Sequence, residues 1–359
     1  MSTHFYPLKI KDIRKETPEC ISIGFEIPEE AEEIFRFTPG QNITLKASIN
    51  GEEVRRSYSI CSIPEEGEFR VAIKKIDKGI FSCHAHSALK PGDVVEVLPP
   101  TGRFFTPLNP QNKKNYLAIV AGSGITPVIS IAKAIMLKEP QSSFTLLFGN
   151  RTRASIIFKE ELEALKNRHI NRFSIHHFLS RERADADLYN GRINAEKMEA
   201  MSGRLFNLNN IDEVFLCGPQ EMIFEVKEWL ESKGFPSRKI HFEIFLSPGQ
   251  SVIKQKSVSG SNHFSDARSK VFLKIDGRET EITLGYEDKS ILQAALDSGA
   301  DLPFSCKGGV CATCRAKLLE GNVEMEINYA LEEDELEKGY ILTCQAHPRS
   351  EVVRVSFDD

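Results

Sequence analysis

The chain has 359 residues, of which 41% are hydrophobic and 27% charged, and its formal net charge is −5 at pH 7. This composition is that of an ordinary globular protein, and the length predicts two to three domains that each bury a core. A pI near 6.1 without a basic stripe interleaved with aromatic residues argues against nucleic acid as a partner. The sequence has no apolar stretch of about 18 residues and no N-terminal targeting pattern, so we expect a cytoplasmic protein without membrane insertion.

Residues 1–110 form a series of short apolar and alternating segments, separated by turn signals such as Pro39-Gly40 and Asn50-Gly51. Segments of this kind are typical of antiparallel strands. We expect strands at residues 5–13, 20–27, 42–48, 56–59, 70–75 and 94–98. The N-terminal domain, residues 1–110, is therefore predicted to be a small antiparallel β-barrel.

Three segments of this barrel have the chemistry of a cofactor site. Residues 56–59 lie on a strand, where alternate side chains point to opposite faces and can line a planar ligand; ordinary strand surface is the alternative. Residues 79–82 open a helical segment whose free N–H groups suit a pyrophosphate. The candidate cofactor-binding residues here are Arg56, Ser57, Tyr58, Ser59, Ile73, Lys74, Gly79, Ile80, Phe81 and Ser82.

Residues 111–246 change to an alternation of strands and helices, which predicts an α/β doubly wound domain. Its first strand, at residues 116–120, leads into Gly122-Ser123-Gly124-Ile125-Thr126-Pro127, and a helical pattern follows. A glycine-rich turn between a strand and a helix binds phosphate, and proline suits the first helical position. Gly122, Gly124, Thr126 and Pro127 are therefore candidate nucleotide-binding residues.

Other candidates follow later strands of the same domain, at the edge where ligands bind in such sheets. Arg151 follows one strand, and Cys217, Gly218 and Pro219 follow another; for Cys217 a buried structural thiol is an equal alternative. The hydroxyl of Ser180 and the guanidiniums of Arg181 and Arg192 have the chemistry needed to bind a 2′-phosphate. These three residues favour NADPH as the electron donor, and NADH is the alternative.

Residues 247–269 are rich in Ser, Gly, Lys and Gln and are predicted to be a linker. The segment from Lys270 to the end has 18 acidic and 10 basic residues, against 33 acidic and 36 basic residues before it. The two parts should attract each other, as internal docking for electron transfer would require.

The C-terminal domain, residues 270–359, is predicted to begin with a hairpin at Asp276-Gly277 and to continue with a helix between Ser290 and Gly299. Cysteines then follow in the spacing C-x4-C-x2-C, with a fourth after 29 intervening residues, which is typical of a plant-type [2Fe-2S] ligand loop. Gly308 and Gly309 would let the loop turn around the sulfurs. A zinc site is the alternative, but zinc usually takes two separate ligand pairs. The predicted ligands are Cys306, Cys311, Cys314 and Cys344.

In the order of its motifs, the chain resembles the ferredoxin-NADP reductase superfamily with a C-terminal plant-type [2Fe-2S] ferredoxin domain of the β-grasp, α+β type. The resemblance implies that Arg56 pairs with flavin phosphate, Tyr58 stacks on the flavin ring and Ser59 bonds near the atom that receives hydride. It also implies that Cys217 lies beside the nicotinamide, that Phe245 abuts the flavin and that Glu243 assists proton movement. A core aromatic is the alternative for Phe245. The segment at 79–82 favours FAD over FMN.

The same resemblance implies an NAD(P)H-dependent oxidoreductase that passes electrons through FAD and a [2Fe-2S] cluster to an oxygenase or hydroxylase component. Related reductases with this domain order serve steroid hydroxylases and acyl desaturases. A self-contained diaphorase or ferric reductase is the alternative, because it would use the same cofactors without a protein acceptor.

Overall fold

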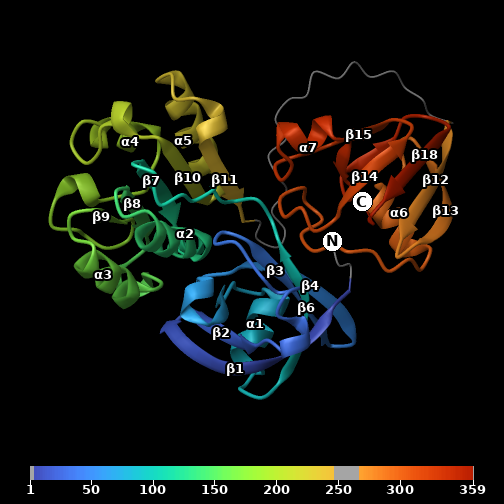
Figure 1. Ribbon diagram of the computed structural model, residues 1–359, viewed down its shortest axis with the longest axis horizontal. Helices are drawn as coiled ribbons and strands as arrows, with labels where there is room; N and C mark the ends of the chain where they lie inside the picture. Colours follow the sequence, from blue (N-terminus) through green and yellow to red (C-terminus); the bar gives the residue numbers. More distant parts are fainter. Residues whose placement is uncertain (1–3, 246–266, 359) are drawn as a thin grey trace.

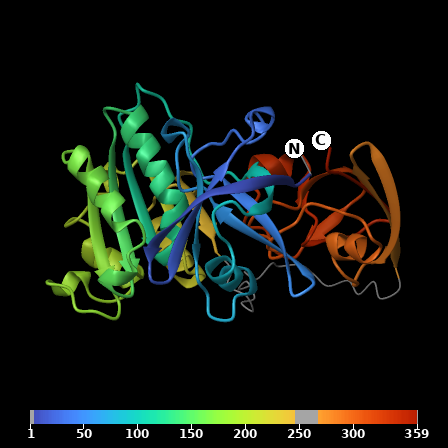
Figure 2. The ribbon, with the colours of Figure 1, turned by 90° about the horizontal axis from the view of Figure 1, so that it is seen from below.

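The structure, a computed structural model, describes residues 4–245 and 267–358 and contains three large sheets (Figure 1). In two perpendicular views the N-terminal barrel contacts both other units (Figures 1 and 2). The predicted linker lies largely outside the described residues. Its last two residues, Arg268 and Ser269, already belong to strand β12, whose pairing with β13 begins at Arg268.

The N-terminal unit is a six-stranded antiparallel sheet in the order β4-β3-β6-β1-β2-β5. An antiparallel bridge between Ile60 and Val71 joins the end of β4 to β5 and closes the sheet into the predicted barrel. Its elements are β1 (Tyr6–Thr17), β2 (Cys20–Glu26), β3 (Asn42–Ile49), β4 (Glu52–Ser59), β5 (Phe69–Lys74), α1 (Ile80–Ser87) and β6 (Val94–Thr101).

The second unit is a five-stranded parallel sheet in the order β11-β10-β7-β8-β9, which confirms the α/β prediction. Alternate residues of β7 enter different cores, with Ala118 on the side of α2 and α3 and Ile119 on the side of α4 and α5. The sheet is therefore covered on both faces. Its elements are β7 (Asn115–Ala121), α2 (Ile125–Lys138), β8 (Ser143–Asn150), α3 (Lys159–Arg168), β9 (Phe173–Leu179), α4 (Ala195–Met201), β10 (Glu213–Gly218), α5 (Gln220–Ser232) and β11 (Ile240–Ile244).

The C-terminal unit combines a mixed sheet, β13-β12-β18-β14-β16, with a small β15-β17 pair, and α6 packs into its core. The expected hairpin occurs at Asp276 and Gly277, both in the left-handed region. Ser290 caps α6 by accepting from the Gln293 N–H at 3.4 Å. The elements are β12 (Arg268–Ile275), β13 (Arg278–Gly285), α6 (Ile291–Asp297), β14 (Arg315–Glu320), β15 (Val323–Met325), α7 (Glu333–Glu337), β16 (Tyr340–Leu342), β17 (Ala346–Pro348) and β18 (Val352–Ser356).

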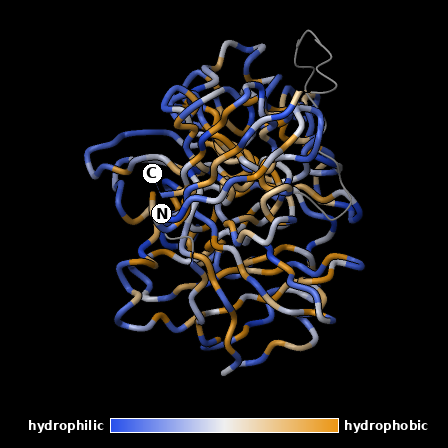
Figure 3. The backbone as a smooth tube through the Cα atoms, turned by 90° about the vertical axis from the view of Figure 1, so that its right-hand side faces the viewer, coloured by the Kyte–Doolittle hydropathy of each residue, from blue (hydrophilic) through white to orange (hydrophobic). Residues whose placement is uncertain are grey.

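Hydrophobic stretches of the chain run through the interior, and hydrophilic stretches lie outside (Figure 3). One hydrophobic core is shared by two units, because barrel residues such as Cys61 and Phe104 belong to the core that α2 covers. The ring of Phe104 meets that of Phe215 edge to face at 5.6 Å. We call this contact between the barrel and the nucleotide unit the first seam.

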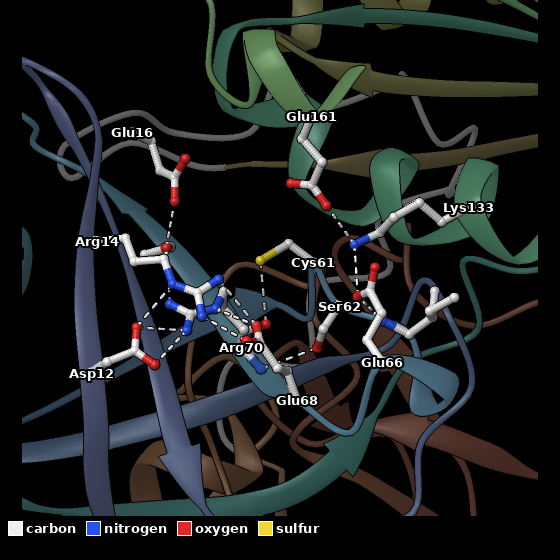
Figure 4. Close-up of polar contacts among 12 residues, drawn as sticks. Asp12, Arg14, Glu16, Cys61, Ser62, Glu66, Glu68, Arg70, Lys133 and Glu161 are labelled. Carbon is white, nitrogen blue, oxygen red and sulfur yellow. Dashed lines mark hydrogen bonds and ion pairs between the residues drawn. The ribbon is translucent and has the colours of Figure 1, made fainter. Parts of the chain in front are cut away.

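A polar cavity of about 310 Å³ lies at the first seam, lined by residues of the barrel and of the nucleotide unit (Figure 4). The ammonium of Lys133, on α2, is bonded to Glu66 of the barrel at 2.9 Å and to Glu161 of α3 at 2.8 Å. The buried Arg70 guanidinium binds both carboxylate oxygens of Asp12, at 2.6 and 2.7 Å. The ion pairs of Lys133 thus join the two units, whereas the Arg70–Asp12 pair lies within the barrel.

Candidate functional site

The predicted flavin segment lines a cavity of about 750 Å³ at the junction of the three units. Arg56, Ser57 and Ser59 of β4 contribute to it, together with Phe245 after β11. Cys306 and Cys311 of the predicted ligand loop lie in its wall. A cavity of this size, with polar groups on one wall and an aromatic side chain on another, can accept a flavin ring.

Ser59 and Glu243 meet inside this cavity, although 184 positions separate them in the sequence. The Ser59 hydroxyl donates to Glu243 at 3.3 Å. Burial raises the pKa of Glu243 to about 8, and the negative charge of Cys311 adds to that rise. A carboxyl of this kind is protonated at neutral pH and can donate a proton.

The other flavin candidates divide into cavity residues and core residues. Ile80, at the start of α1, is 48% exposed and lines the cavity. Ile73 and Phe81 are buried in the barrel core, so only their backbones can reach a cofactor. The ring of Phe81 lies 5.6 Å from that of Tyr58 and supports it from behind.

The segment before α1 is built for close approach of the chain. A Cβ on Gly79 would lie 2.5 Å from the hydroxyl of Ser82, so a larger residue would disturb the turn. That hydroxyl accepts from the Ile76 N–H at 3.1 Å and holds the turn that precedes the helix. Lys74 points toward the nucleotide unit, because its ammonium lies 3.8 Å from the Cβ position of Gly122.

The glycine-rich turn connects β7 to α2 as predicted and touches the end of β10. A Cβ on Gly124 would lie 2.2 Å from the carbonyl oxygen of Cys217, so glycine is required there. Gly122 is left-handed, with φ 56°. Thr126 donates its hydroxyl to Ser123 O at 3.0 Å and so stabilises the turn. Pro127 is the third residue of α2 and not the first, as the sequence suggested, because the helix already begins at Ile125. The turn therefore lies beside the strand end that carries Cys217, Gly218 and Pro219.

Cys217 itself is fully buried, and burial raises the pKa of its thiol well above the usual value. The thiol is therefore protonated and is not a nucleophile at neutral pH. Cys217 lies near the carboxyl end of β10, and ligands bind at this edge of such sheets.

The residues proposed for a 2′-phosphate come together at the carboxyl end of β9. A bridge between Leu179 and Asn190 brings the segment of Arg192 beside that of Ser180 and Arg181. Both guanidiniums belong to exposed residues, and within residues 4–245 and 267–358 neither has an ion pair. Arg151 is also exposed, and its carbonyl accepts from the Arg181 N–H at 2.8 Å.

Two residues that the sequence analysis did not select also lie at this edge. Asn150 ends β8 and Gln220 begins α5, and the amide nitrogen of each side chain is buried without a hydrogen-bond partner in the described part of the chain. A buried amide donor without a partner is costly unless a ligand satisfies it. The sequence could have indicated both residues, because each is adjacent to a candidate nucleotide-binding residue, Arg151 or Pro219.

The four predicted cluster cysteines form two hydrogen-bonded pairs. Cys306 bonds to Cys311, and this bond lowers the pKa of the Cys311 thiol. Cys314 bonds to Cys344 and lowers the pKa of the Cys344 thiol in the same way. Among the described residues no three His, Cys, Asp or Glu side chains lie close enough for one metal ion. A cluster of two irons needs four thiolates, two for each iron, and the paired arrangement fits that need.

Backbone groups also face the sulfurs. The Gly308 N–H donates to Cys306 Sγ at 3.3 Å, and Gly309 adopts φ 74° with its Cβ position 2.9 Å from Ile327 O. The predicted roles of these glycines thus differ. Of the two glycines, Gly309 has the left-handed conformation and Gly308 does not. Lys307 and Ala312 of the same loop also have it, although they carry side chains.

The ferredoxin unit contacts the barrel through a polar surface, which we call the second seam. Ser57 and Ser305 lie 2.9 Å apart at their hydroxyl oxygens, and Thr44 and Thr313 lie 3.4 Å apart. Toward the nucleotide unit, the ring of Tyr329 packs 5.4 Å from that of Phe224. Val310 of the ligand loop also packs against the core of the nucleotide unit, so the ferredoxin unit contacts both other units.

Three family models match the chain in the order of these units. They describe an oxidoreductase FAD-binding domain at residues 7–106, an oxidoreductase NAD-binding domain at 118–228 and a 2Fe-2S iron-sulfur cluster binding domain at 273–349. The expected FAD, pyridine nucleotide and [2Fe-2S] cluster are thereby confirmed as classes of cofactor, and the zinc alternative is set aside. None of the helices in the described part of the chain has the length and apolar character of a membrane span.

Curated relatives match over nearly the full length. The chain is 44% identical to a component of the 1,2-phenylacetyl-CoA epoxidase of Escherichia coli, covering 99% of this chain and 98% of that protein. It is 32% identical to the ferredoxin reductase component of 3-ketosteroid-9-alpha-monooxygenase of Rhodococcus rhodochrous, covering 98% and 96%. The solved structure of phthalate dioxygenase reductase has the same fold, with a TM-score of 0.57, 24% identity and 98% of each chain covered.

Proposed function

Because the chain belongs to the ferredoxin-NADP reductase superfamily, in the branch with a C-terminal [2Fe-2S] ferredoxin domain, we propose that it is the reductase component of a multicomponent oxygenase. It takes electrons from NADPH and passes them through FAD and the cluster to the oxygenase component. The observation that carries this proposal is the single cavity that Ser59, Glu243 and the cluster ligand Cys311 all line. Glu243 comes from the nucleotide unit, Ser59 from the flavin barrel and Cys311 from the ferredoxin unit, so all three units meet at this cavity.

The acceptor we propose is the oxygenase component of a phenylacetyl-CoA epoxidase. The full-length relative in Escherichia coli carries that name, and this sequence resembles such a reductase over nearly its full length, including residues 306–314 and 340–345. A steroid hydroxylase is the second candidate, because the relative in Rhodococcus rhodochrous serves a 3-ketosteroid monooxygenase. An acyl desaturase or another acceptor stays possible for this domain order.

The flavin, when bound, accepts a hydride and releases its electrons singly, and the cluster carries one electron at a time. In this proposal Arg56 binds flavin phosphate, Tyr58 stacks on the ring, and the backbone of residues 79–82 binds the pyrophosphate. Phe245 covers the opposite side of the cavity. The cavity lining supports the roles of Arg56 and Phe245, and the free N–H groups at the start of α1 support that of residues 79–82. Tyr58 is not among the residues that line the cavity, so its role rests on the family resemblance.

Ser59 and Glu243 are the residues we propose to move a proton. The Ser59 hydroxyl bonds to Glu243, whose raised pKa keeps a proton available at neutral pH. Cys217 is proposed to lie against the nicotinamide as a neutral, buried thiol. Its role there is to shape the contact and exclude water.

NADPH is the proposed donor because the exposed guanidiniums of Arg181 and Arg192 lie together near Ser180. An acidic residue at this edge would favour NADH by bonding to the 2′-hydroxyl. The nearby Glu182 is instead paired with Arg153, whose backbone and side chain both donate to it, at 2.8 and 3.1 Å. Asn150 and Gln220 are proposed to donate to the nucleotide from the neighbouring strand and helix.

We propose three domains at residues 1–110, 111–246 and 268–359, with the segment 247–267 joining the last two, because β12 begins at Arg268. A cytoplasmic location agrees with the absence of disulfides among the described cysteines, because reducing compartments keep thiols free.

The test is reconstitution with purified oxygenase components. With the epoxidase component, phenylacetyl-CoA and NADPH, we expect product formation coupled to nucleotide oxidation, and a lower rate with NADH. Product formation only with a steroid hydroxylase would assign the second acceptor. Rapid dye reduction without activity toward any oxygenase would support the self-contained diaphorase instead.

A further inference from the structure

Arg55 is a buried charge on β4, immediately before the flavin segment. Its side chain is only 5% exposed, although β4 is the first strand in the order of the barrel sheet and pairs along its length with β3 alone. The guanidinium donates to Leu302 O at 3.0 Å, to Asp301 Oδ1 at 3.0 Å and to Glu53 Oε1 at 2.7 Å. Two of these three acceptors belong to the ferredoxin unit.

The flat faces of the same guanidinium are also covered. The ring of Phe304 lies 4.3 Å from its central carbon, and the ring of Phe5 lies at 4.9 Å. A buried cation needs partners, and a planar guanidinium that both bonds and stacks cannot be replaced by an ammonium of similar charge. Without the ferredoxin unit, Arg55 would keep Glu53 and lose the acceptors at 301 and 302.

The contacts of Arg55 are continuous with the cluster loop. Asp301, Leu302 and Phe304 lie directly before Ser305 and the ligand Cys306. Ser305 meets Ser57, which is two residues after Arg55 on the same strand. The strand that lines the flavin cavity therefore binds the residues that lead into the cluster loop.

The remaining contacts of the second seam are weaker than this one. Neutral hydroxyl pairs such as Ser57–Ser305 contribute less than bonds to a charged group. Arg103 bonds to Asp334 of α7 at 3.0 Å and lies 3.5 Å from the buried carboxylate of Glu335, but its guanidinium is 40% exposed, so water weakens both ion pairs. Within the described residues, Arg55 is the one buried cation among the barrel contacts to the ferredoxin unit.

We propose that Arg55 is a positioning residue for electron transfer, which holds the ferredoxin unit so that its cluster ligands face the flavin cavity. This inference rests on the proposed function. One electron leaves the reduced flavin and one electron enters the oxidised cluster in each step, and the rate of such a step falls steeply with distance. Loosening the segment 301–304 should therefore slow cluster reduction without affecting hydride transfer.

The test compares Arg55→Ala and Arg55→Lys with wild-type holoprotein of full length. After anaerobic mixing with NADPH, flavin reduction should change less than twofold, while cluster reduction should slow at least tenfold in Arg55→Ala. Arg55→Lys should recover only part of that loss. The matched control is Arg36→Gln, which removes an exposed barrel arginine that pairs with Glu33. The control should behave as wild type.

A second readout needs no electron donor and separates this inference from the proposed function. In small-angle X-ray scattering, Arg55→Ala should have a larger radius of gyration than wild type and the control. Unchanged scattering with unchanged cluster reduction would overturn the inference, and so would an equal slowing of both steps. If Arg55→Ala does not fold, Asp301→Asn removes an acceptor whose side chain is 84% exposed and should give the same changes at smaller size, whereas no change would reject the role.

Discussion

The two seams of the barrel are built from different interactions. The first seam shares a hydrophobic core with the nucleotide unit, through residues such as Cys61 and Phe104, and adds the buried ion pairs of Lys133. The second seam binds the ferredoxin unit through hydroxyls, one buried arginine and an exposed ion pair. The ferredoxin core, by contrast, contains only residues of its own unit.

The difference indicates which contact can open. Separating the first seam would expose apolar surface and leave buried charges unpaired, both of which are costly. Separating the second seam exposes mostly polar groups, which water can solvate, together with a few apolar contacts such as those of Phe304 with Arg55 and of Tyr329 with Phe224. Hydride transfer needs a fixed geometry between nucleotide and flavin, whereas an electron carrier must also reach its acceptor. The first seam suits the former step and the second seam suits the latter.

The largest effect is expected from Cys311→Ser, which separates the functions of the two seams. Loss of one thiolate should abolish the cluster, whereas flavin should stay bound because its residues lie on the other side of the second seam. Ferricyanide reduction should survive, and cytochrome c or oxygenase reduction should collapse. Iron and flavin assays check this, with Cys83→Ser as the control. Loss of flavin together with iron would contradict the separation.

A truncation at the first seam should destabilise the barrel and the nucleotide unit together. Phe104 is 6% exposed and meets Phe215, so Phe104→Ala should cost about 3–5 kcal/mol of unfolding free energy. Denaturation followed by flavin release should report this loss. The control Ile170→Ala alters a residue that is 71% exposed and should cost little. A loss confined to the ferredoxin signal would reject the shared core as the basis of the first seam.

The nucleotide preference tests a site that lies entirely on one side of the first seam. Replacing Arg181 or Arg192 by Ala should raise the KM for NADPH, because each charge-assisted contact contributes roughly 1.5–3 kcal/mol. The KM for NADH should stay nearly constant, and so should the rate of cluster reduction at saturation. Steady-state kinetics with both nucleotides measures this. Equal effects on both, or a wild-type preference for NADH, would reject the assignment.

The smallest effect over a single pH unit concerns Glu243, which lies where the two seams meet. Its folded pKa of about 8 exceeds the value of about 4.3 expected in the unfolded chain. The stability that it contributes is therefore fully present below pH ~4.3 and is lost as the pH rises through 8, with a slope of at most ~1.4 kcal/mol per pH unit. Glu243→Gln should flatten this dependence in denaturation series. The control Glu33→Gln, which alters an exposed carboxylate, should keep it. Parallel wild-type and Glu243→Gln profiles would exclude the raised pKa.

The fold and most of the local motifs could be predicted because they depend on nearby residues. The strand periodicity, the turn at Asp276-Gly277 and the cap at Ser290 each act within a few positions. The cluster could also be predicted, because three of its four cysteine ligands lie within nine residues of the sequence. Charge asymmetry also indicated that the ferredoxin unit would attract the rest of the chain, and the pairs Arg55–Asp301 and Arg103–Asp334 have the expected sign.

What the sequence could not provide are contacts between distant segments. Arg55 and Leu302 are 247 positions apart, and no local pattern distinguishes Arg55 from the neighbouring Arg56. The meeting of Ser59 with Glu243 depends equally on the packing of two units. Asn150 was missed because an amide after a strand is common, and only its burial without a partner marks it.

The most direct test of the account is to cut the chain within residues 247–266 and measure cluster reduction by NADPH at increasing dilution. If the second seam opens, the two fragments should stay folded and coloured, and cluster reduction should become second order in protein. It should also weaken as salt rises, because screening at ~0.15 M limits attraction beyond about 8 Å. The intact chain should be nearly insensitive to dilution. A cut protein that precipitates, or whose cluster reduction does not change with dilution, would contradict a seam that opens.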